Sequence, residues 1–267
     1  GQDISKLNLF DLVTEFIVNG IRQGEKIATE YAQEIENRIA RATERDAIRI
    51  SFAVPPKGQR WLGVTYPGHP IQIEINAGYL NSTLAMKSAS FSPFEVLDTL
   101  IHEGRHAWQM SLTQEHPLLH QMEASCLGYV SVNDKSTYND YLHYIIQDNE
   151  IDARSFALRF MFYFATEHQA EFGSVLGNWL VQKIQQEIGQ LNMAAERISD
   201  EQLDAWNRLR IEKLKEHGQD IATDEFDAYT TIRVYKNAVL PLVESIREAK
   251  KEIDDEQALM LTFELYT

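Results

Sequence analysis

A histidine pair at helical spacing is the part of this sequence that could do chemistry. The stretch His102-Glu103-Gly104-Arg105-His106 reads H-E-x-x-H. Residues four apart lie on one face of a helix, so both imidazoles would reach a single metal ion. Glu103 would stand beside that ion, where a carboxylate can take a proton from a bound water. The motif therefore predicts zinc ligands at His102 and His106 and a catalytic general base at Glu103.

The residues before the motif predict a helix with a defined start. Ser92 is a candidate N-cap, Pro93 suits the first turn, and Glu95 would complete a capping box. Asp98, one turn before His102, lies on the same face and is a candidate to orient its imidazole. Two histidines four apart can also be ordinary polar residues on a helix. The glutamate and this setting favour the metal interpretation.

Three alternating segments upstream predict a small β-sheet. They span residues 47–54, 61–66 and 71–76, and the first and third have apolar side chains at every second position. The turn sequence Pro55-Pro56-Lys57-Gly58 follows the first segment, so we expect the second to return beside it. The sequence therefore predicts an antiparallel sheet that leads into the helix carrying the histidines.

A catalytic zinc ion needs a third protein ligand and one position left for water. The metzincin pattern would need a histidine and a glycine where this chain has Leu112 and Gln109, so that subclass is excluded. A second acidic stretch, residues 149–157, offers Glu150 and Asp152. These two carboxylates would lie on different faces of a helix.

Here the chain resembles the zincin metallopeptidases of the gluzincin type, which include the thermolysin-like enzymes. In that family a glutamate ligand on a second helix is followed three residues later by a small residue, and Glu150 with Ala153 fits this pattern. Asn149 matches an asparagine often found before the ligand. The stretch also resembles the motif of ImmA/IrrE-type metallopeptidases. The resemblance covers roughly residues 48–165 and implies that Glu150 is the third zinc ligand.

The chain departs from the thermolysin-like pattern four residues after Glu150. Those enzymes carry an aspartate there, and this chain has Arg154. Asp98 and Asp152 both stay open as replacements for its supporting role.

Several further residues are weaker candidates. A tyrosine stabilises the oxyanion in several zincins, and the candidates for that role are Tyr144, Tyr229 and Tyr235. Three other histidines are more typical of a surface or core rim than of a metal site: His116, His120 and His143.

The composition limits the classes of function. The 267 residues carry a net charge of −15 and show no basic stripe or Gly-rich phosphate loop, which argues against nucleic-acid binding. Cys126 is the only cysteine, so no intrachain disulfide can form. No segment is long and apolar enough to predict a membrane span. No signal peptide is visible at the start, which favours a cytoplasmic protein or one delivered without such a signal.

Outside the three strand segments the sequence reads as helical. Gly24 is expected to divide an N-terminal helix pair, and Ser199 with Gln202 forms a second candidate capping box. We expect an α+β protein that is zincin-like and mainly helical, with the small antiparallel sheet before the metal-site helix. Residues 1–267 would form one catalytic domain, in which residues 172–267 are a candidate helical annex.

The expected function is a Zn²⁺-dependent endopeptidase that acts on a protein or peptide. One alternative is a binding or sensor protein on the same scaffold without peptidase activity. Retention of Glu103 argues against it, because a purely structural zinc site needs no base. The other alternative is a delivered bacterial effector or toxin that uses the same chemistry. The sequence does not identify the substrate or the oligomeric state.

Overall fold

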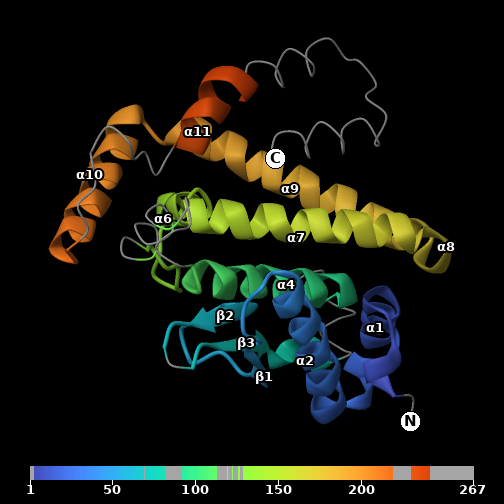
Figure 1. Cartoon of the computed structure of the whole chain (residues 1–267). Helices are drawn as coiled ribbons and strands as arrows, with labels where there is room; N and C mark the ends of the chain where they lie inside the picture. The colour runs from blue at the N-terminus through green and yellow to red at the C-terminus, as the bar shows by residue number, and fades with distance from the viewer. Residues whose placement is uncertain are drawn as a thin grey trace. The chain divides into compact units, whose positions relative to one another are not determined.

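The computed structural model (Figure 1) describes residues 3–68, 70–81, 92–112, 119, 122, 126, 129–218 and 230–240. The chain packs as two compact units. The first comprises residues Gly1–Ser111 with Phe156–Trp179, and the second comprises Leu112–Ser155 with Leu180–Thr267. The structure is mainly helical with one small sheet, so the α+β class is correct.

The first unit begins with a helix pair. The described elements are a 3-10 turn (Ile4–Lys6), α1 (Leu9–Glu15), a π-helical turn (Phe16–Gly20), a second 3-10 turn (Ile21–Gln23) and α2 (Glu25–Ala42). Gly24 separates the two helices with a φ of 96°, a conformation that side chains other than glycine rarely adopt. The predicted division at this glycine is confirmed.

The sheet contains β1 (Arg49–Ala53), β2 (Gly63–Tyr66) and β3 (Gln72–Asn76) in the order β1-β3-β2. β2 and β3 pair antiparallel, but β1 pairs parallel with β3. The prediction of an antiparallel sheet is therefore wrong for β1. The parallel pairing sets Ile50 beside Ile73 and Phe52 beside Ile75, and all four are buried. Alternation identifies these apolar faces, yet it carries no information on strand direction.

Helices α2 and α4 (Pro93–Met110) pack against the sheet. α2 packs against β1, and α4 packs against β2, β3 and α2. On the β1 edge, Gln33 of α2 accepts from the Ile50 N–H at 2.9 Å and donates to the Ile48 carbonyl at 2.8 Å. These two bonds satisfy backbone groups that an additional strand would otherwise bind.

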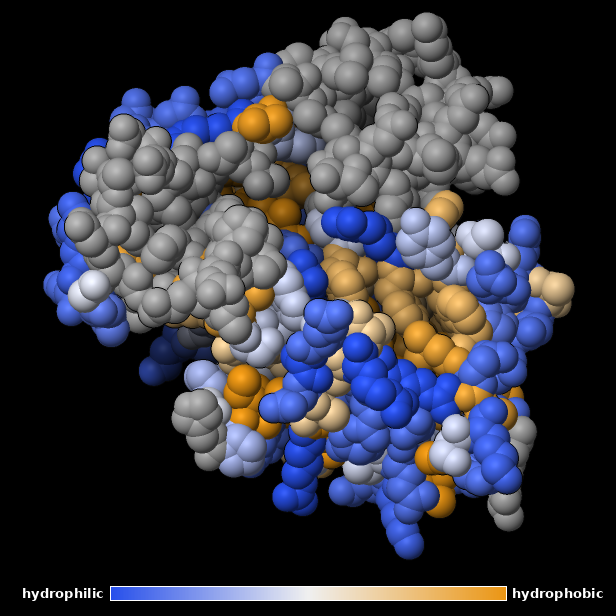
Figure 2. Space-filling model, in the orientation of Figure 1, coloured by the Kyte–Doolittle hydropathy of each residue, from blue (hydrophilic) through white to orange (hydrophobic). Residues whose placement is uncertain are grey.

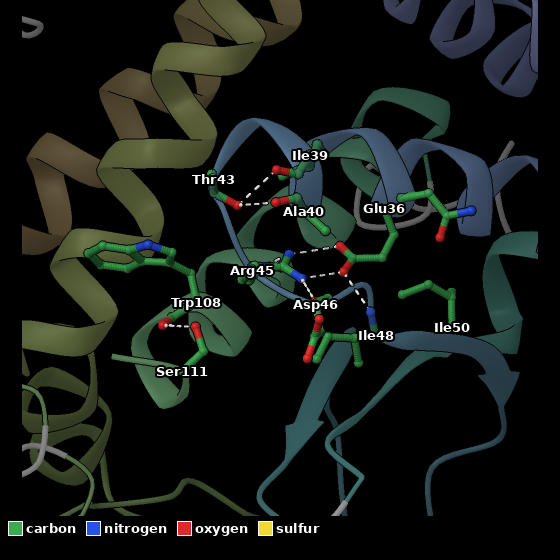
Figure 3. Close-up of polar contacts among 12 residues, drawn as sticks. Glu36, Ile39, Ala40, Thr43, Arg45, Asp46, Ile48, Ile50, Trp108 and Ser111 are labelled. Atoms are coloured by element: carbon green, nitrogen blue, oxygen red, sulfur yellow. Dashed lines mark hydrogen bonds and ion pairs between the residues drawn. The ribbon is translucent and has the colours of Figure 1, made fainter. Parts of the chain in front are cut away.

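A buried ion pair joins three of these elements (Figure 3). Arg45, in the loop after α2, bonds the Glu36 carboxylate of α2, with Nη2 and Oε2 2.9 Å apart. Glu36 also accepts from the Ile48 N–H at 3.0 Å, just before β1. Arg45 Nη2 donates to the carbonyl of Gly104 in α4 at 3.2 Å. The two charged side chains are 2% and 1% exposed, so separating them would leave an uncompensated buried charge.

At the start of α4 the predicted N-cap at Ser92 is present, without the capping box expected from Glu95. The Ser92 hydroxyl accepts from the Glu95 N–H at 3.2 Å, and Pro93 occupies the first turn. The Glu95 carboxylate accepts from the Trp179 indole at 3.2 Å. An aromatic cluster of the first unit surrounds this end of the helix and includes Phe10, Phe94, Phe164, Phe172 and Trp179. The helix that carries the histidines is therefore fixed at its first turn.

α7 (Asp148–Glu167) and α9 (Ser174–Arg197) each contribute residues to both units, and α8 (Gln169–Phe172) belongs to the first. The second unit also holds α6 (Tyr138–Ile145), α10 (Asp200–Glu216), α11 (Thr230–Val234) and a π-helical turn (Tyr235–Val239). The Ser199–Gln202 capping box of α10 is present as predicted. The helical run expected after the sheet is interrupted between α6 and α7.

On the face shown in Figure 2, hydrophilic side chains gather over α2, in agreement with the acidic composition of the chain. None of the helices within the described residues combines the length and the hydropathy that a membrane span requires.

His143 predicts a pH dependence of stability. Its ring stacks on Trp206, with centroids 3.4 Å apart and planes 4° from parallel. Burial, together with the charge of Arg210, lowers the pKa of His143 from 6.5 to about 3. Between these two values the unfolded chain binds a proton that the folded chain excludes, so the free energy of unfolding falls as the pH is lowered.

Lowering the pH from 6.5 to 5 should therefore cost about 1.5 kcal/mol through this group. His143→Phe keeps a flat ring and cannot titrate, so this part of the pH dependence should disappear. Urea titrations at both pH values measure the difference, and carboxylates common to the two proteins cancel. Equal pH dependence in both proteins would contradict the assignment.

Candidate functional site

The motif residues lie on the middle of α4, and the two histidines face each other. Their Nε2 atoms are 3.0 Å apart, and the ring planes are at 86° to one another. His106 is 8% exposed, whereas His102 is partly exposed. Imidazole nitrogens are ligands that small cations such as zinc accept, and the helical spacing is the reason that these two meet.

Gln109 holds the far side of the His106 ring. Its Oε1 atom lies 2.8 Å from His106 Nδ1, and the side chain is 4% exposed. Metal-binding histidines usually bond a carboxylate, carbonyl or water through their second nitrogen. From the sequence alone, Gln109 indicated only that the metzincin pattern is absent, because that pattern has a glycine at this position. Its position three residues after His106 was the available signal for this contact.

β2 holds Glu103 in place. The Thr65 hydroxyl lies 2.7 Å from Glu103 Oε2 and 3.0 Å from the Glu103 backbone carbonyl. Glu103 is 6% exposed. A hydroxyl at this distance fixes one carboxylate oxygen, which leaves the other to accept a proton. No sequence signal linked these residues, which lie 38 positions apart.

Gly63 allows this close approach. A Cβ atom at Gly63 would lie 2.6 Å from Thr99 Cγ2 and 2.8 Å from Glu103 Cγ, both closer than real Cβ contacts. The glycine therefore lets β2 reach the helix at the level of the motif glutamate.

Glu150, in the first turn of α7, is fully buried. The Tyr129 hydroxyl donates to Glu150 Oε1 at 3.1 Å, and Arg154 Nε lies 3.9 Å from Oε2. Arg154 also bonds both oxygens of Glu187, at 2.9 and 3.0 Å. Burial alone would lower the pKa of Arg154, but Glu187 and nearby groups raise it well above its ordinary value. A permanent cation therefore lies beside the Glu150 carboxylate.

The three zinc ligands proposed from the sequence belong to different units. His102 and His106 lie in the first unit and Glu150 lies in the second. Two imidazoles and one carboxylate are a donor set that zinc accepts.

The weaker candidates from the sequence lie on several different elements. Asp98 is buried on α4, and Asp152 is partly buried on α7. Tyr144 packs near the second unit's core, and its ring centroid is 5.8 Å from the Arg154 guanidinium carbon. Tyr235 is buried in that core and donates to Asn192. The remaining candidates lie outside the described residues: Tyr229, His116 and His120.

No protein-family model matches the chain, and no curated protein or solved structure matches it either. The function is therefore inferred from the chemistry of the side chains just described.

Gly63→Ala tests the fit between β2 and α4. The added methyl must displace Thr99 or Glu103, and overpacking of this kind costs about 1–3 kcal/mol. Gly189→Ala in α9 is the control, because no atom lies within 4 Å of its added methyl and alanine favours a helix. Chemical denaturation should show Gly63→Ala destabilised and Gly189→Ala unchanged or slightly stabilised. Wild-type stability in Gly63→Ala would show that β2 does not approach the helix this closely.

Proposed function

We propose that this protein is a zinc-dependent endopeptidase that hydrolyses a peptide bond in a protein substrate. The observation that carries the proposal is the contact between His102 and His106 on α4, with Glu103 on the same helix held by Thr65 of β2. A purely structural zinc site normally fills all four positions with protein ligands and needs no carboxylate base. A zincin-like relation is part of the proposal and is supported by the motif helix packed against a small sheet.

The donor set suits zinc. His102, His106 and Glu150 would hold the ion and leave one position for water. When bound, zinc supplies an activated water and polarises the scissile carbonyl. Glu103 would accept the proton of that water as it attacks and then return it to the leaving amine. Thr65 would hold the base in position during both proton transfers.

The free edge of β2 supports a peptide substrate. Within the described residues β2 pairs with β3 alone. Asn76 N–H bonds to the Leu62 carbonyl, and the register pairs Val64 with Glu74. Antiparallel alternation then turns the backbone groups of Gly63 and Thr65 toward the free edge. An extended peptide added there would run beside the Glu103 carboxylate.

Zinc binding is the first test of the ligand set. Protein stripped with a chelator and dialysed against zinc should contain close to one zinc per chain by elemental analysis. His102→Ala, His106→Ala and Glu150→Gln should each lose most of it, since two remaining ligands hold zinc poorly. Asp152→Asn is the matched control and should keep the metal. Full zinc content in a variant that carries both His102→Ala and His106→Ala would contradict the proposal.

Glu103→Gln separates chemistry from metal binding. The amide keeps the shape and the Thr65 contact but cannot act as a base, so cleavage should fall by about 10²–10⁴-fold while the zinc content stays normal. Casein and a proteome-derived peptide library serve as substrates, with new termini identified by mass spectrometry. Glu30→Gln, on the exposed face of α2, is the control for loss of a carboxylate.

An unchanged cleavage rate in Glu103→Gln would contradict the assignment of the base. Zinc binding without any cleavage by the wild type would instead favour a binding or sensor protein, or an effector that acts only on a specific protein.

A further inference from the structure

Gln109 stands out among the residues around the histidines because it faces away from the proposed ligand position. Its amide oxygen lies 2.8 Å from His106 Nδ1, and both side chains are nearly buried. An amide oxygen can only accept a hydrogen bond. When the His106 ring is neutral, this contact requires that Nδ1 carries the proton and that Nε2 presents a lone pair.

We propose that Gln109 is a positioning residue that holds His106 in the tautomer able to bind a metal through Nε2. The proposal rests on the zinc site described above, because only a ligand role requires one particular tautomer. The opposite amide orientation would place the NH₂ group against Nδ1 and move the ring proton to Nε2. That proton would then occupy the point at which the two histidines converge.

The contact between the two rings extends the consequence to His102. The two Nε2 atoms are 3.0 Å apart, which is a hydrogen-bond distance and requires one proton between them. Because His106 Nε2 holds a lone pair, His102 must carry that proton on its own Nε2 in the metal-free protein. Metal binding would then require His102 alone to change tautomer, while His106 is already prepared.

The position of Gln109 makes this role possible. It lies three residues after His106 on the same helix, so the two side chains are neighbours on one face. At 4% exposure, its amide has little competition from water for the imidazole proton. A surface glutamine at the same spacing would exchange freely between protein and solvent partners.

Nitrogen-15 NMR of the metal-free protein tests the inference directly, because long-range couplings within each imidazole distinguish the two neutral tautomers. We expect His106 with the proton on Nδ1 and His102 with the proton on Nε2. Two isosteric variants extend the test: Gln109→Glu keeps an accepting oxygen, and Gln109→Met removes it. Zinc affinity is measured for each by competition with a chelator.

Gln109→Met should mix the His106 tautomers and weaken zinc binding by about 10–100-fold, as loss of such partners does elsewhere. Gln109→Glu should keep the proton on His106 Nδ1. Its zinc affinity should stay within a few-fold of the wild type and therefore exceed that of Gln109→Met. A wild-type His106 with its proton on Nε2 would overturn the inference, and so would equal zinc affinity in all three proteins.

The two proposals fail separately in this experiment. The tautomer of the metal-free wild type is measured without zinc, and its outcome does not depend on any activity. The expected tautomers in a protein that binds no zinc would remove the peptidase proposal and the ligand role of His106, and would leave only the contact between Gln109 and His106 standing. The reverse tautomer in a zinc-binding protein would remove the role of Gln109 alone. Should Gln109→Met fail to fold, the wild-type spectrum still decides.

Discussion

The buried ion pair between Glu36 and Arg45 fixes the frame in which the motif lies. One carboxylate and one guanidinium connect α2, the residue before β1 and the Gly104 carbonyl inside the motif. A buried pair is not a large source of stability, since desolvation offsets much of its attraction. Its effect is geometric, because neither partner can leave without exposing the other as an unpaired charge. The motif helix is thereby held in one place relative to the sheet.

The fixed position of α4 determines how closely β2 can approach it. With α4 fixed, β2 approaches the helix at Gly63, where any larger residue would collide with Glu103. Thr65, two residues later on the same strand, then bonds the glutamate carboxylate. Within the described residues, the strand whose Thr65 side chain holds the proposed base also has one edge without a paired strand. Base and substrate would therefore be positioned by the same four-residue strand.

Local signals in the sequence predicted much of this arrangement. The Ser92 cap, the division at Gly24 and the start of α10 depend on residues a few positions apart, and all three are present. The direction of β1 could not be predicted, because alternation is identical in parallel and antiparallel strands. The interruption between α6 and α7 was also missed, since the helical pattern continues through it.

Around the candidate site, too, local contacts could be predicted from the sequence and long-range contacts could not. The facing of His102 and His106 follows from their spacing, whereas the partners of the motif come from elsewhere in the fold. Thr65 reaches Glu103 across 38 positions, and Tyr129 reaches Glu150 across 21. No pattern in a single sequence encodes such contacts. Gln109 is the exception, because its spacing from His106 was visible before its role was.

The proposed function requires one zinc ion bound by two imidazoles and one carboxylate of this chain. Diffraction from zinc-loaded crystals, recorded on both sides of the zinc absorption edge, locates such an ion. We expect a single strong anomalous peak at about 2.0–2.2 Å from His102 Nε2, His106 Nε2 and a Glu150 oxygen. A peak elsewhere, or one whose third protein ligand is a residue other than Glu150, would contradict it.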